Sequence, residues 1–239
     1  LNTSRALDPY TFYHANYAPF NILNELENNK IGINVLNTKF QAELAYKPIN
    51  DLRLSVIGAV QYDTSTQEHN ITEHANQAQA YRAMDNALIR DANSYLYKDP
   101  TNAYALPISV LPSGGFYHKT DLQKISWDIR ATANYNHTFD HTHALNVLGG
   151  LDVSNVDRKR TFFNGVGMQY DGGEIPFYIY EFFKKNIDDN AVYYSLNNTY
   201  NRTAAFFATG TYSYKHRYNL TGTYRYEGTN RLGRSRSAR

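Results

Sequence analysis

Imidazole and carboxylate groups gather at one short segment of the chain. His141 and His143 stand beside Asp140, and both side-chain types ligate divalent metals. The neighbouring sequence supplies no further donor cluster to complete a coordination shell. These residues also separate two stretches of strand-like pattern, so we interpret them as a solvated turn and predict no metal site.

Acidic residues form the second group with chemical potential. Glu181 precedes the adjacent pair Asp188 and Asp189, and paired carboxylates can serve acid-base chemistry or calcium binding. Their spacing matches neither a glycosidase pair nor the ligand pattern of an EF-hand. The sequence also lacks a G-x-S-x-G motif, a phosphate-binding glycine loop and an H-E-x-x-H motif. We therefore predict no enzyme and no cofactor.

Aromatic residues in polar segments are the best candidates for ligand contact. Tyrosine rings stack on sugar rings and peptide side chains, and neighbouring polar groups fix orientation. Each of these residues could instead pack the loop that carries it, or contact a partner protein. The candidate binding residues are Tyr95, Tyr97, Tyr170, Asp171, Tyr178 and Tyr180.

The elements that hold these segments follow a period of two, which is typical of strands. Apolar and polar residues alternate over 38–46 and 52–63, with turn residues between them. The pattern returns over 125–139 and 145–154, and again over 203–214 and 218–227. It disappears over 64–123, apart from a helix-like stretch near 77–84, and over 159–198. We therefore predict six strands in three hairpins, separated by two long loops.

Composition restricts the class of protein. The 239 residues include no cysteine and carry a net charge of +2, which argues against disulfides and against a nucleic-acid binder. No run approaches the ~18 apolar residues of a membrane helix, so a membrane span here would consist of strands. The residues from Leu1 on do not have the pattern of a signal peptide, so we expect that the signal was removed or that the start of the chain is missing.

The asymmetry of the hairpins favours a transmembrane β-barrel. Tight turns at one end and loops of about 40 to 60 residues at the other match the short periplasmic turns and long outer loops of outer-membrane barrels. The strands match the roughly 9 to 11 residues that cross a bilayer at a tilt. Aromatic residues lie near both ends of the apolar faces, as girdles would. They are Tyr46, Phe139, Tyr212, Tyr214 and Tyr218 near the turns, and Tyr62, Trp127, Tyr224 and Tyr226 toward the loops.

Five segments resemble the barrel region of SusC/RagA-type TonB-dependent outer-membrane transporters. The most specific is the last of them. They are Asn16 to Asn21, Glu25 to Asn29, Leu111 to Gly115, Gly150 to Asp152, and Tyr224 to Gly233.

This resemblance implies a bacterial outer-membrane location and a 22-stranded barrel plugged by an N-terminal domain. Such a protein imports a large nutrient, a glycan or an oligopeptide, which it captures with a SusD-like surface lipoprotein and drives through the TonB complex. Residues 1–239 would then be part of the barrel domain, without the plug, the TonB-contacting segment or the C-terminal strands. Its partners would be the lipoprotein, the TonB complex, the lipid bilayer and the ligand.

Two alternatives remain open from the residues alone. A soluble or surface-exposed β-rich carbohydrate-binding module would pair its apolar faces with each other, and it would have shorter strands. An outer-membrane hydrolase would need a nucleophile or carboxylate constellation, and the sequence offers no convincing one.

Overall fold

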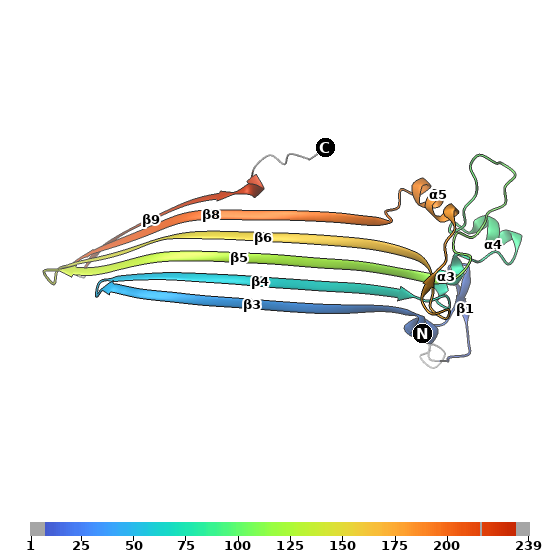
Figure 1. Cartoon of the computed structure of the whole chain (residues 1–239), viewed down its shortest axis with the longest axis horizontal. Coiled ribbons are helices and arrows are strands. Elements are labelled where there is room, and N and C mark those ends of the chain that lie inside the picture. Colours follow the sequence, from blue (N-terminus) through green and yellow to red (C-terminus); the bar gives the residue numbers. More distant parts are fainter. Residues whose placement is uncertain (1–7, 216, 233–239) are drawn as a thin grey trace. The chain divides into compact units, whose positions relative to one another are not determined.

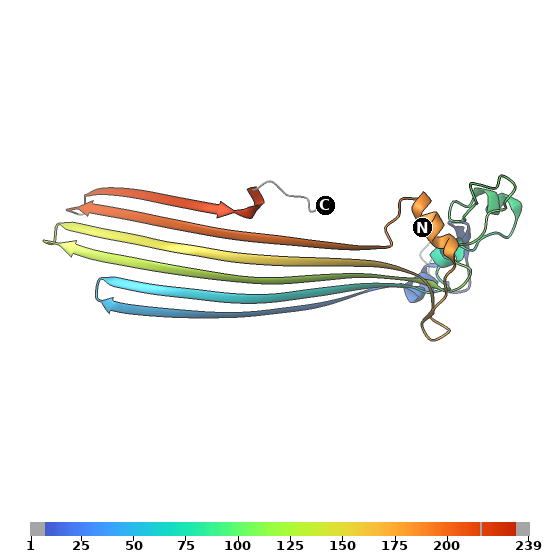
Figure 2. The same ribbon diagram turned by 45° about the horizontal axis from the view of Figure 1, so that its top comes forward.

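The computed structural model describes residues 8–215 and 217–232. Its main sheet contains six long strands in the order β3-β4-β5-β6-β8-β9, and the short β7 pairs with β6. Figures 1 and 2 show these six strands side by side. Consecutive strands are neighbours throughout, as in an up-and-down meander. The prediction of six antiparallel strands in three hairpins is confirmed.

The long strands have the following bounds: β3 Asn29–Ile49, β4 Leu52–Ile71, β5 Gly115–Phe139, β6 His143–Gln169, β8 Tyr194–Tyr214 and β9 Tyr218–Thr229. The short elements are β1 Tyr13–Ala15, β2 Ala18–Phe20, β7 Ile175–Pro176, α2 Ile22–Asn28, α3 Asn76–Ala80, α4 Ala87–Ala92, α5 Tyr180–Asp188 and the 3-10 turn η1 Asn230–Leu232. Gly233, the last residue of the most specific family-like segment, lies outside the described residues.

The chain divides into two compact units. The strand unit contains 35–64, 122–159 and the residues from Asn197 on, and it includes the tight turns. The loop unit contains the residues up to Asn34 together with 65–121 and 160–196. Asp140 and His141 lie in one of the tight turns with positive φ angles of 45° and 56°, a conformation that aspartate tolerates better than most residues.

The strands are longer than the sequence predicts. They contain 12 to 27 residues. β4, β5, β6 and β8 all extend into the predicted loops. The intervening segments accordingly shorten to 72–114 and 170–193. In the loop unit Thr66 donates to Asp121 at 2.8 Å and Tyr117 donates to Glu68 at 2.6 Å. Polar residues on both faces hide the period of two there, although the strands continue.

The hairpin β8–β9 has two chemically distinct faces. On one face Phe206 pairs with Tyr226, Ala208 with Tyr224, and Tyr212 with Leu220. On the other face Thr209 pairs with Thr223 and Thr211 with Thr221, and the hydroxyl oxygens of the second pair lie 3.1 Å apart. Strand geometry places alternate residues on opposite faces. The predicted alternation therefore becomes one apolar and one polar face.

The apolar face is the more exposed of the two. Phe206 is 60% exposed and Leu220 74% exposed, whereas Ala205 on the opposite face is 2% exposed. The same holds in β4, where Val56 and Val60 are exposed and Ala59 is buried. A water-soluble sheet normally buries its apolar face. The only other sheet within the described residues is the two-stranded β1–β2.

Candidate functional site

The segments between the long strands pack around a small core of their own. Ile71, Leu111 and Val110 are almost completely buried, and Phe116 and Phe182 join them from separate elements. The helix-like stretch near 77–84 becomes α3, whose Ala78 and Ala80 are buried. The predicted loops are therefore folded, which fixes the positions of the aromatic candidates.

The first family-like segment forms a hairpin and a helix cap. Asn16 and Tyr17 have positive φ angles of 48° and 67° between β1 and β2. Asn21 then caps α2, because its side-chain oxygen accepts from the backbone N–H of Leu23 at 2.8 Å. The buried Asn76 donates to three carbonyl oxygens of 15–19 at 2.8 to 3.1 Å. This motif is structural, since it attaches the N-terminal hairpin to α3.

The segment ending in Gly114 and Gly115 allows a close approach of two backbones. A Cβ atom on Gly115 would lie 1.8 Å from the carbonyl oxygen of Ile71, so no other residue fits there. Arg82 donates to the carbonyl oxygens of Gly114 and Glu73 at 2.6 Å each. Burial lowers the pKa of this guanidinium, but it stays charged at any physiological pH.

Tyr95 and Tyr97 follow α4, and they differ in how far their side chains are exposed. Tyr95 stacks on Tyr81 with ring centroids 4.6 Å apart, and its ring remains partly exposed. Tyr97 is only 7% exposed, and its backbone forms two 2.9 Å hydrogen bonds with Ile108. Tyr97 therefore packs the loop core, and Tyr95 presents part of a ring at its surface.

Tyr170 and Asp171 join distant segments of the loop unit. The Tyr170 hydroxyl donates to the carbonyl oxygen of Phe116 at 2.8 Å, and burial raises its pKa to about 12. The carboxylate of Glu73 accepts from the backbone N–H groups of both residues, at 3.2 and 2.9 Å. Asp171 also pairs with His74 at 2.6 Å, where both side chains are exposed.

Tyr178 and Tyr180 are the most accessible candidates. They lie just before and at the start of α5 and are 58% and 65% exposed. The Lys184 ammonium lies 4.7 Å from the centre of the Tyr180 ring, a cation–π contact. A hydrogen bond to Glu181 is the main cause that raises the pKa of Tyr180, and Tyr97 and Asp99 contribute less.

Sequence reasoning did not identify the side chains that hold these candidates in place. Tyr81, Tyr193 and Glu73 make the central contacts, and Tyr193 packs edge-on against Phe163 and Phe182. Only the aromatic character of 178–194 pointed toward such a cluster. A ligand role for the six predicted residues stays a prediction.

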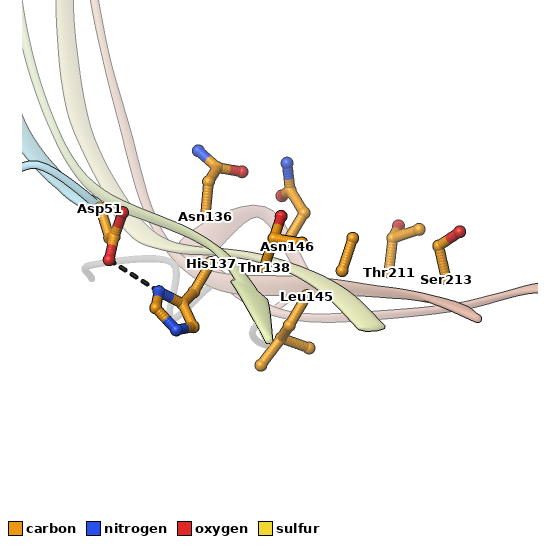
Figure 3. Close-up of a pocket in the computed structure, with 9 residues that line it drawn as sticks. Asp51, Asn136, His137, Thr138, Leu145, Asn146, Thr211 and Ser213 are labelled. Carbon is orange, nitrogen blue, oxygen red and sulfur yellow. Dashed lines mark hydrogen bonds and ion pairs between the residues drawn. The ribbon is translucent and has the colours of Figure 1, made fainter. Parts of the chain in front are cut away.

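The strand unit has an open polar cavity of about 570 Å³ near the tight turns. The Nδ1 atom of His137 lies 2.7 Å from a carboxylate oxygen of Asp51, and the Asp51 carbonyl accepts from the Asn136 backbone N–H at 2.8 Å. Figure 3 shows His137 and Leu145 pointing away from the side on which Asn136 and Asn146 lie. The pair fixes the turn before β4 against β5.

The residues considered for metal or acid-base chemistry have other contacts. His143 hydrogen-bonds to the Tyr212 hydroxyl, and Asp189 pairs with Lys185 at 3.0 Å. In residues 8–215 and 217–232, no three His, Cys, Asp or Glu side chains come close enough to hold a metal ion. No helix in that part of the chain is both long and apolar enough to cross a membrane.

The comparisons with known proteins identify the fold. No protein-family model matches the sequence, and no curated protein matches it significantly. Among solved structures, one described as the RagAB peptide transporter has a TM-score of 0.63 over 94% of this chain, at 12% identity. The chain has the fold of part of that transporter. The predicted structural resemblance is therefore confirmed at the level of fold.

Two further RagAB structures give the same result. The RagAB peptide importer in the "open-open" state matches with a TM-score of 0.62 over 93% of the chain at 13% identity, and the "closed-closed" state with 0.64 over 94% at 12%. These alignments cover 20% to 21% of the solved chains. The present chain thus spans about a fifth of the RagAB chains that it matches.

Proposed function

We propose that this chain forms part of the wall of an outer-membrane transporter that imports a large nutrient. The single observation that carries the proposal is the inverted exposure of the sheet, whose apolar face is open and whose polar face is partly buried. Lipid is the solvent in which that arrangement is stable, because barrel strands point apolar side chains outward and polar ones inward.

The apolar face is too extensive for a water-soluble surface. On β3 alone Leu36, Phe40 and Leu44, which share one face, are 55% to 73% exposed. Large exposed patches of this kind mark protein or membrane contacts. We assign the face to the bilayer because it runs over successive strands in step with the period of two. The carbohydrate-binding alternative would need a second apolar sheet to cover it.

The opposite face suits the water-filled side of a transporter. Lys124 pairs with Asp63 at 2.8 Å, and Arg130 pairs with Asp152 at 2.6 Å. Ser55 and Thr132 share a hydrogen bond of 2.7 Å. These contacts join neighbouring strands through polar groups. They would form a hydrophilic lumen wall, against which a plug domain from elsewhere in the protein could pack.

The loop unit would contribute to ligand capture. Among the six candidates, Tyr178, Tyr180 and Tyr95 keep ring surface available, whereas Tyr97 and Tyr170 hold the loop together. We propose an oligopeptide as the ligand ahead of a glycan, because the matching structures are described as a peptide transporter. The exposed Ile187 in α5 and Val192 just after it would meet a SusD-like lipoprotein.

No bond is made or broken in this proposal. Energy would arrive through the TonB complex by way of other parts of the protein, and the chain would act as scaffold, lumen wall and loop surface.

The test is the solution behaviour of the full-length protein. We expect it to stay monodisperse in a non-ionic detergent and to aggregate when the detergent is removed, because the apolar face then meets water. A protein that stayed monodisperse without detergent would rule the proposal out and favour the carbohydrate-binding module.

A further inference from the structure

A groove on the apolar face of the strand unit contains charged residues, which a lipid-facing wall does not require. Its first part, of about 600 Å³, runs across β5, β6, β8 and β9. Its lining residues include Trp127, Asn155, Arg202, Ala204, Gly228 and Asn230.

A second hollow of about 340 Å³ continues along the same strands. Its residues lie further from the tight turns than those of the first part. For example, Ile125 is two positions from Trp127 on β5, and Tyr200 is two positions from Arg202 on β8. Residues two apart on a strand share a face, so the two hollows follow one another on a single face. The relevant residues of this second part are Gln123, Ile125, Asp157, Lys159, Asn198 and Tyr200.

The groove lies where polar residues interrupt the apolar face of the strand unit. Toward the tight turns its strands continue with Ile129 and Phe206, which are 45% and 60% exposed. Trp127 and Tyr200 follow at 38% and 54% exposure, and beyond them polar residues such as Lys159 and Asn198 stand beside Ile125. Tryptophan and tyrosine favour the boundary between hydrocarbon and head groups, so this level corresponds to a membrane interface.

Two cations stand at this boundary. Lys159 and Arg202 are both exposed, and among the described residues neither has a carboxylate within ion-pairing distance. Asp157 lies on the same face of β6, and its Oδ1 atom is buried without a hydrogen-bond partner in the described part of the chain. These two positive charges stand against one carboxylate, and Arg158 also lines the second hollow, so the groove has a net positive charge.

Arg202 is held in position while part of its guanidinium stays available. Its Nε donates to Asn155 at 3.3 Å, and its backbone N–H donates to Asn230 at 2.9 Å. Asn230 in turn donates to the carbonyl oxygen of Tyr200 at 2.7 Å. The two terminal nitrogens have no hydrogen bond to any described residue, and they form the fork that binds phosphate oxygens well.

We propose that this groove binds the phosphate-bearing head group of an anionic membrane lipid. Lys159 and Arg202 receive the phosphate, and the side of Trp127 packs against the upper part of an acyl chain. Ala204 and Gly228, paired across β8 and β9, leave the hollow in which that chain lies. The inference rests on the proposed membrane location, and it adds a specific lipid site to a wall that would otherwise meet lipid without preference.

The test uses the full-length protein in a non-ionic detergent and native mass spectrometry. The probes are lipid A, which is a bisphosphorylated glycolipid, and digalactosyl diacylglycerol, which is an uncharged one. The variant is Lys159→Gln with Arg202→Gln. The matched control, Lys47→Gln with Arg53→Gln, removes the same two residue types from the strand unit near a tight turn. Arg202→Lys tests whether charge at this position suffices.

We expect the groove variant to bind lipid A on the order of tenfold more weakly, because each cation near a membrane surface attracts anionic lipid. The control and Arg202→Lys should stay within about twofold of the native protein. The uncharged glycolipid should bind all variants alike. Retention of lipid A by the groove variant would overturn the proposal.

Inorganic phosphate separates a lipid site from a site for the free anion. We expect millimolar phosphate to leave lipid A bound, because the acyl chain adds contacts that the ion lacks. Displacement by phosphate alone would assign the site to free phosphate and overturn the lipid proposal. A groove variant that still needs detergent while losing no lipid A would sink this inference alone and leave the membrane location intact.

Discussion

At the residue scale, Tyr170 shows how a predicted ligand residue came to have a structural role. Its hydroxyl reaches both the carbonyl oxygen of Phe116 and the side chain of Asn70, at 2.8 and 3.1 Å. Burial raises its pKa from 10.0 to about 12, and the neighbouring Glu174 adds to the rise. The neutral phenol is therefore the form that the folded loop unit favours.

Tyr170→Phe tests this role by its pH dependence. Because the folded pKa is raised, the stabilisation is fully present below pH 10 and is lost as the pH rises through about 12. In full-length protein, the phenolate absorbance that differs between native and variant should have its midpoint near pH 12. A midpoint near 10 would contradict the buried contact. At neutral pH the variant should lose about 1–3 kcal/mol of loop stability.

The sequence could not separate ligand residues from packing residues at this scale. Tyr97 and Tyr178 both look like loop tyrosines in the sequence, yet one is 7% exposed and the other 58%. The difference depends on contacts with Leu111, Phe116 and Phe182, which come from distant segments. No local sequence pattern predicts such long-range contacts. A local property, the positive φ angle of Asn16 and Asp140, is by contrast one that asparagine and aspartate favour.

At the element scale, the period of two was sufficient to identify all six long strands but not their ends. Apolar alternation ends near 63 in β4, while the strand continues to Ile71. A strand needs only backbone hydrogen-bond partners. β4 therefore continues through polar residues such as Thr66, where no apolar environment requires apolar side chains. The helical turns of α3 and α4 were harder to predict, because each has at most six residues.

Adjacent residues of β8 give a matched test of the two faces. Ala208→Arg places a charge on the apolar face opposite Tyr224, and Thr209→Arg places it on the polar face opposite Thr223. In bilayers the first change should cost about 2–4 kcal/mol, because a lipid-facing arginine near the midplane is expensive. The second should cost less than about 1 kcal/mol. Chemical denaturation of the refolded full-length protein measures both.

The order of these two costs tests whether the apolar face meets lipid or water. If it met water, Ala208 would be a tolerant exposed position, so Ala208→Arg would be harmless and Thr209→Arg the more harmful change. That outcome would contradict a lipid-facing strand.

At the scale of the whole molecule, the sheet has two edge strands, β3 and β9. In the proposed barrel both would pair with strands from the remainder of the protein, since this chain spans only about a fifth of the RagAB chains that it matches. The loop unit then adds a folded surface whose accessible tyrosines would meet the ligand.

Loss of the accessible rings should weaken uptake. In full-length protein, Tyr178→Ala with Tyr180→Ala should reduce the affinity for the imported peptide on the order of tenfold, because stacking contacts of about 0.5–1.5 kcal/mol each are lost. Tyr104→Ala is the matched control, since Tyr104 is 95% exposed and lies in another loop. Binding of a labelled peptide mixture to the purified full-length protein measures this affinity, and equal effects of both changes would argue against a ligand role for Tyr178 and Tyr180.

The most direct test of the membrane wall is the accessibility of β8 in a bilayer. The chain contains no cysteine, so single cysteines at 204–213 of the full-length protein can carry spin labels for collision measurements with oxygen and a water-soluble nickel complex. We predict a period of two, with oxygen contact highest at 204, 206, 208 and 212 and nickel contact highest at 205, 209, 211 and 213. Nickel contact at the even positions would show that the apolar face meets water, and it would contradict the proposed wall.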